Sequence, residues 1–97
     1  MKVRILHSAR KDMMEAYHFY ERQADGLGTY FLDVIFSDID SLQFFAGIYA
    51  PFFKDYRRLL SKRFPFAIYY LLENEKVSVH AVLDCRRHPA WIRKKLS

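Results

Sequence analysis

The strongest constraint on the fold lies in the last third of the chain, where two strand-like runs are separated by a tight turn. The run at 64–72 is almost uncharged, and the run at 76–84 alternates apolar with polar residues. Because only residues 73–75 separate them, the pattern predicts an antiparallel hairpin. Pro65 cannot donate a ladder hydrogen bond, so we expect it at a strand start or a sheet edge. The two faces of the second run are expected to carry Val77, Val79, Ala81 and Leu83, and Ser78, His80, Val82 and Asp84.

The first half of the chain has the pattern of a short strand followed by two helices. Residues 2–6 alternate polar and apolar, and Ser8 is a candidate N-cap for the first helix. Gly26-Leu27-Gly28 ends this helix, and such a short link predicts that the second helix returns antiparallel to the first. The expected inward stripes are Ala9, Met13, Ala16, Tyr17, Tyr20 and Ala24, then Phe31, Val34, Ile35, Ile39 and Leu42.

The helical pattern fails between 44 and 55, where Gly, Pro and aromatic residues predict a loop. A strand is expected at 56–60, and Pro89 is well suited to the first turn of a terminal helix at 90–96. The order is β-α-α-β-β-β with a short C-terminal helix, and its last three strands form an antiparallel meander. Because each layer must bury its apolar side, we predict a two-layer α+β fold with the helical hairpin on one face of the sheet.

Composition indicates one globular domain spanning residues 1–97, since 52% of the side chains are apolar. Cys85 is the only cysteine, which excludes an intramolecular disulfide. The first twelve residues have no apolar core typical of a signal peptide, and no run approaches the roughly 20 apolar residues of a membrane helix. We therefore expect a soluble protein of a reducing compartment.

Positive charge is concentrated in two segments, at 54–63 and 86–95, within a net charge of +5. Guanidinium groups bind phosphate and carboxylate through a planar fork of donors, so paired arginines on neighbouring strands predict a binding surface. Charge that protects an edge strand is the alternative explanation. The candidate binding residues are Arg57, Arg58, Arg86, Arg87, His88, Trp91, Arg93 and Lys94.

Trp91 and His88 each allow more than one interpretation. The Trp91 ring could seal one end of the core, stack on a base or anchor a protein partner. His88 lies beyond a strand end, where it could act as a base or have no function beyond the loop. The histidines are scattered and no nucleotide-binding or metal-ligand spacing occurs, so we expect neither a metal nor a cofactor.

Three segments resemble the RelE/ParE superfamily of type II toxins. These are the helical hairpin YHFYERQADGLGTYFLDVI (17–35), the strand YRRLL (56–60) and RFPFAIYYLLENEKVSVHAVLDCRRHP (63–89). The resemblance spans nearly the whole chain, and the hairpin that continues into the Arg-Arg-x-Pro turn is its most specific part. It implies a bacterial or archaeal cytoplasmic toxin that a cognate antitoxin protein wraps and neutralises.

The branch of the superfamily, RelE-like or ParE-like, is judged from the residues that match each subgroup. RelE-like members cut messenger RNA on the ribosome without a metal. Of the residues in their pattern, this chain keeps an Arg after the last strand, Arg87. It has Ala67 where the pattern has an Arg and Arg93 where the pattern has a Tyr. ParE-like members are similar to this chain at FPFAIYY and RRHP, and the resemblance implies inhibition of DNA gyrase. A ribosome-dependent nuclease using Arg87 and His88 is the alternative, and a folded but harmless family member is another.

Overall fold

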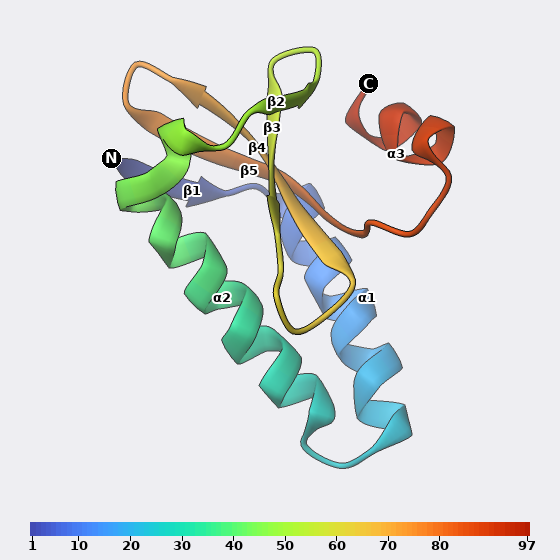
Figure 1. Ribbon diagram of the computed structural model, residues 1–97. Helices are drawn as coiled ribbons and strands as arrows, with labels where there is room; N and C mark the ends of the chain where they lie inside the picture. The colour runs from blue at the N-terminus through green and yellow to red at the C-terminus, as the bar shows by residue number, and fades with distance from the viewer.

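Five strands form one mixed sheet in the order β1-β5-β4-β3-β2 (Figure 1). The computed structural model describes all residues 1–97. The elements in chain order are β1 (Lys2–Ile5), α1 (His7–Gln23), α2 (Leu27–Phe45), the 3-10 helix η1 (Ala46–Ile48), β2 (Pro51–Phe53), β3 (Tyr56–Leu60), β4 (Phe66–Glu73), β5 (Lys76–Asp84) and α3 (Pro89–Leu96).

The sheet is a meander from β2 to β5, and β1 is added at its edge next to β5. Strands β2 to β5 pair antiparallel with their sequence neighbours, whereas β1 pairs parallel with β5. A parallel pair needs a crossover connection, and α1, α2 and the meander supply it. The predicted α+β order is confirmed, with one further short strand, β2.

The helical hairpin closes through contacts at the Gly26-Leu27-Gly28 turn. Gly26 has φ 86°, and its N–H and that of Gly28 both donate to the Glu21 carboxylate at 2.9 Å. The Gly26 N–H is the main cause of a lowered pKa for Glu21. A Cβ at Gly28 would lie 2.6 Å from the backbone oxygen of Tyr17, so the close approach of α1 and α2 requires glycine there.

The hairpin packs on one face of the sheet, and we call this side the helix face. Its core contains fourteen buried residues, among them Met13 of α1, Phe31 and Ile35 of α2, and Tyr70 of β4. The predicted stripes are largely confirmed, although Ala24 is exposed and Val34 is half-buried. Most of the buried apolar volume therefore lies between the hairpin and the sheet.

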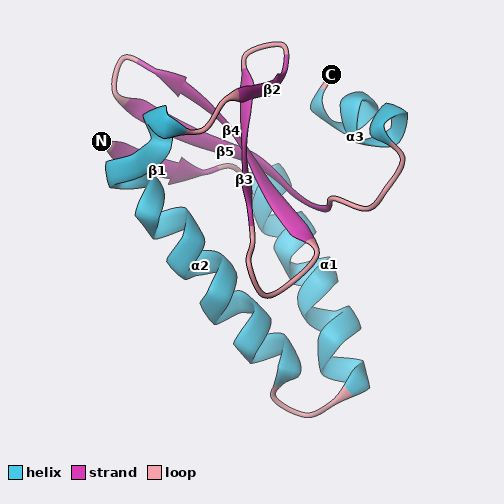
Figure 2. Cartoon of the chain, in the orientation of Figure 1, coloured by secondary structure: helices cyan, strands magenta, loops and turns pink.

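The other side of the sheet, which we call the α3 face, is covered over a smaller area (Figure 2). Its core has six buried residues, to which α3 contributes Ile92 and Leu96. A loop after β5 carries the chain to α3, which packs on this face. None of the three α-helices has both the length and the apolar character needed to span a bilayer.

Two local predictions are wrong. Leu6 is the N-cap residue of α1 and makes no side-chain cap bond, while the Ser8 hydroxyl donates to the His80 carbonyl at 2.7 Å. The expected loop at 44–55 instead contains the end of α2, η1 and β2. The apolar residues of this segment follow neither a helical nor a strand period throughout, so the sequence pattern did not predict its regular structure.

A bulge in β5 changes which side chains share a face. Tyr69 pairs with Ala81 but Tyr70 pairs with Val79, so His80 is an additional residue on β5. As a result Val79 packs on the helix face, Ala81 packs on the α3 face, and Val82 returns to the helix face. The simple alternation predicted for 76–84 is therefore wrong beyond Val79.

Candidate functional site

The main candidate site is a cleft of about 290 Å³ between α1 and α3, which we call the α1–α3 cleft. Its floor is the start of β4 and the end of β5. Phe19, which is 52% exposed, stands at its rim on the α1 side, and Trp91 stands on the α3 side. The lining residues are Asp12, Glu15, Ala16, Phe19, Tyr20, Phe66, Val82, Leu83, Asp84, Arg86, Arg87, Trp91 and Lys95.

The turn after β5 is fixed by an ion pair between Arg86 and Asp84. Arg86 Nη2 lies 2.7 Å from Asp84 Oδ2 and Nε donates to Oδ1 at 3.1 Å, while the Arg86 backbone N–H also donates to Oδ1 at 2.9 Å. The Arg86 side-chain bond lowers the pKa of Asp84, and Asp84 in turn raises the pKa of Arg86. Arg86 therefore shapes the turn and is less available to a partner than its exposure suggests.

Arg87 is held against the Trp91 ring, with the guanidinium carbon 3.8 Å from the ring centroid. Lys95 Nζ lies 5.4 Å from the same centroid. Both distances fall within the range of cation–π attraction, which orients the cations without neutralising them. Arg87 and Lys95 keep their charge at the rim, and Arg93 and Lys94 are exposed on the same short helix.

His88 is the N-cap residue of α3. Its Nδ1 accepts a hydrogen bond from the Ala90 N–H at 3.0 Å, so the neutral ring carries its proton on Nε2. The outward nitrogen is then a donor, and the accepting nitrogen is already occupied. This arrangement does not favour His88 as a general base, although it gives the residue a clear role in starting α3.

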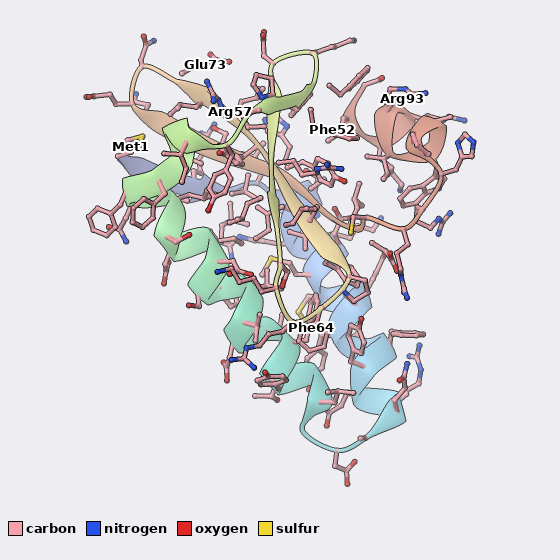
Figure 3. All side chains as sticks on the ribbon, in the orientation of Figure 1. Met1, Phe52, Arg57, Phe64, Glu73 and Arg93 are labelled. Carbon is pink, nitrogen blue, oxygen red and sulfur yellow. The ribbon has the colours of Figure 1, made fainter.

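Arg57 and Arg58 lie on opposite faces of the sheet. Arg57 is opposite Tyr70 on the helix-face side, and its Nη1 donates to the Tyr49 carbonyl at 2.6 Å. Arg58 is opposite Tyr69 on the α3 face, where its guanidinium lies 4.2 Å from the Phe52 ring centroid. Figure 3 shows Arg57 far from Arg93 of α3. The candidate binding residues Arg57 and Arg58 therefore do not share a face, and only Arg58 lies on the same face as α3.

Asp12 closes the free edge of β5 beyond β1. Its Oδ2 accepts a hydrogen bond from the Val82 N–H at 3.0 Å. Ser8, one helical turn earlier on α1, donates a hydrogen bond to the His80 carbonyl. Burial raises the pKa of Asp12 to about 6, against the lowering effects of the Val82 hydrogen bond and of Lys95. Side chains of α1 thus form hydrogen bonds with backbone groups of β5 that another strand could otherwise pair with.

A second cleft, of about 340 Å³, continues along α1 and shares Asp12, Glu15 and Lys95 with the first. On its sheet side Tyr56 and His80 meet edge to face, with ring centroids 5.2 Å apart and Tyr56 Oη 3.5 Å from His80 Nδ1. Burial lowers the pKa of His80, and the nearby charge of Arg4 lowers it further.

Sequence reasoning missed the α1 side of these clefts. Phe19 offered a signal, because it is an aromatic residue outside the buried stripe of its helix. Asp12 offered none, since a carboxylate beside a buried Met13 is ordinary on an amphipathic helix. The chemistry available in the α1–α3 cleft is recognition of a partner through aromatic contacts and charges of both signs.

A scan of protein-family models finds no match for this chain, and a search of curated proteins finds none either. Among solved structures, a chain described as "Chromosomal ParDE TA system from P. aeruginosa" superposes with a TM-score of 0.74 at 18% sequence identity. The superposition covers 84% of this chain and 92% of that chain. At this identity the likeness establishes the fold, and it agrees with the fold that the RelE/ParE resemblance implies.

Proposed function

We propose that this protein is the toxin component of a type II toxin–antitoxin module and that a cognate antitoxin neutralises it. The observation that carries the proposal is the shared fold over most of both chains with a member of a ParDE TA system. The motifs at 17–35 and 63–89 support the same assignment, because they resemble the RelE/ParE superfamily.

The antitoxin would bind in the α1–α3 cleft through an acidic amphipathic segment. Phe19 and Trp91 offer apolar contacts at its two sides, and Arg87 and Lys95 offer cations that are not paired with a carboxylate. The net charge of +5 would steer an acidic segment toward this rim. An antitoxin bound there would cover the exposed basic residues of α3.

The proposed target is DNA gyrase, as for ParE-like toxins. The surface assigned to the target consists of Arg87, Arg93 and Lys94, with Trp91 as the aromatic anchor of the interface. Arg58 contributes from the α3 face, while Arg57 is not included because its guanidinium is bonded to backbone carbonyls of the segment after α2.

Antitoxin binding is tested by co-expression with the neighbouring reading frame and affinity measurement on the purified pair. We expect Arg87→Gln and Phe19→Ser each to weaken binding by about tenfold or more, as for interface anchors. Arg22→Gln is the matched control, since Arg22 is exposed in the last turn of α1 and outside the cleft. Equal affinities for all three variants would reject the cleft as the binding site.

The target is tested by inducing the chain alone in bacteria and examining plasmid supercoiling and DNA breaks. Loss of negative supercoiling or accumulation of breaks, absent in an Arg93→Gln/Lys94→Gln variant, is the expected result. Codon-linked transcript cuts with normal supercoiling would instead identify a ribosome-dependent nuclease. Normal growth with soluble protein present would identify a harmless family member.

A further inference from the structure

A second basic cluster lies at the opposite end of β5 from α3. Lys2 and Arg4 of β1 and Lys76 of β5 line a cleft of about 230 Å³ together with Val77 and Ser78, and no carboxylate lines it. Val3, Val77 and Val79 pack on the helix face, so the residues that alternate with them are directed to the α3 face. We call Lys2, Arg4, Lys76 and Ser78 the β1–β5 cluster.

The register of the two strands makes this cluster unfavourable in itself. Lys2 is directly opposite Lys76, and Arg4 is directly opposite Ser78. Like charges at opposed positions destabilise a sheet. Cations on β1 are explained by the protection of an edge strand, but Lys76 lies on β5, which has a neighbour on both sides. On its other side Lys76 is opposite Glu73 of β4, which favours a lysine at this position, but the opposition of Lys2 and Lys76 is itself unfavourable.

The cations of the cluster are also free of ion pairs. The only ion pair of the protein joins Arg86 to Asp84, at the other end of β5. Glu73 is opposite Lys76 across the β4–β5 turn, but no contact within ion-pair distance joins them. The eight residue steps of β5 separate the two ends by about 26 Å, well beyond the screening length of about 8 Å at physiological salt. The cluster is therefore electrostatically independent of the α3 rim.

We propose that the β1–β5 cluster binds a phosphate group. Lys2, Lys76 and Arg4 line one cleft that has room for a tetrahedral anion, and the Ser78 hydroxyl can add a neutral donor. A bound dianion removes the repulsion between Lys2 and Lys76, which is the physical reason for tolerating their opposition. The phosphate belongs either to a free anion or to the backbone of a nucleic acid, since both present the same oxygens.

The test compares thermal unfolding in sodium phosphate with unfolding in sodium chloride of equal ionic strength. We expect phosphate to raise the midpoint of the full-length protein because it binds the folded state. Arg4→Gln and Lys76→Gln should each weaken phosphate binding by about tenfold, the usual effect of losing one charge-assisted hydrogen bond. Lys62→Gln, which removes an exposed lysine outside the cluster, should keep the full phosphate effect.

A second readout separates a binding site from a merely structural one. In chloride alone, Lys76→Gln should leave the midpoint unchanged or raise it, because it relieves repulsion from Lys2. A labelled single-stranded oligonucleotide, followed by fluorescence anisotropy, distinguishes the source of the phosphate. Binding of the oligonucleotide but not of phosphate, lost in Lys76→Gln, assigns a nucleic-acid backbone. No binding of either ligand, or equal losses in Lys62→Gln and Lys76→Gln, would overturn the proposal, and neither result bears on the α1–α3 cleft.

Discussion

The two faces of the sheet are covered in different ways, and the difference separates stability from recognition. On the helix face two long helices bury a core of fourteen residues, none of which is charged. On the α3 face one eight-residue helix helps to bury only six residues, and half-buried residues, most of them aromatic, pack against them. A large core tolerates little change, whereas a small peripheral one can open at a low free-energy cost.

This contrast implies that the helical hairpin and the sheet unfold together, while α3 can detach first. The attachment of α3 rests on Ile92 and Leu96, the Arg87–Trp91 contact and the His88 cap. Trp91 is the only tryptophan of the chain, so its fluorescence reports on this attachment alone. Far-UV circular dichroism reports mainly on α1, α2 and the sheet.

The largest effect is expected for Phe31→Ala on the helix face. Phe31 is fully buried, and its ring lies 5.1–5.2 Å from those of Tyr20, Phe64 and Phe66. Removing it should lower the free energy of unfolding by about 3–5 kcal/mol. Urea denaturation measures the loss, and both optical signals should shift together. A loss smaller than that of Ile92→Ala would reverse the proposed ranking of the two faces.

Ile92→Ala on α3 should lower the free energy of unfolding by about 2 kcal/mol. This is near the lower end of the range for truncating a buried isoleucine, because α3 can detach without unfolding the rest of the protein. The Trp91 signal should then change at a lower urea concentration than the circular dichroism. Coincident transitions in this variant would mean that α3 is part of the same cooperative unit as the hairpin.

The sequence predicts the helix face well because its signals are local. The spacing of Met13, Phe31 and Ile35 is set by helical periodicity, and short links make α1 and α2 neighbours. Strand order in the meander follows from the same short links. None of these features depends on a contact between residues distant in sequence.

The α3 face was less predictable because its geometry depends on long-range register. The bulge at His80 moves Val82 to the helix face, and no sequence signal marks such an additional residue. The faces of Arg57 and Arg58 follow from their pairing with Tyr70 and Tyr69. The α1–α3 cleft joins segments some seventy residues apart, as the Asp12–Val82 bond shows, so only the fold brings its two sides together.

A smaller effect on stability is expected at Asp12, where the helix-face and α3-face regions meet. Its folded pKa of about 6 lies above its ordinary value of 3.8, so the folded state binds the proton more tightly than the unfolded state. The stabilisation this gives is full below pH 3.8 and is lost as the pH rises through 6. Partial exposure limits the effect to about 1 kcal/mol.

Asp12→Asn keeps an acceptor for the Val82 N–H and removes the titration. Its stability relative to the unmodified protein should therefore rise by about 1 kcal/mol between pH 4 and pH 7. Urea midpoints at several pH values measure this difference, which also cancels the titration of groups common to both proteins. A difference that does not vary with pH would mean that Asp12 titrates normally.

The smallest effect is expected for Arg87→Ala. The guanidinium lies over the Trp91 ring at an exposed site, where a cation–π contact contributes about 0.5–1 kcal/mol. Because Arg87 fixes the ring beside the cleft, its loss should shift Trp91 emission and make the ring more accessible to a neutral quencher. Lys94→Ala is the control, since Lys94 is exposed on α3 and is not one of the two cations placed over the ring. Identical emission and quenching in the two variants would show that Trp91 is held by α3 packing alone, and the α3 face would then owe its order to its small core and not to its charges.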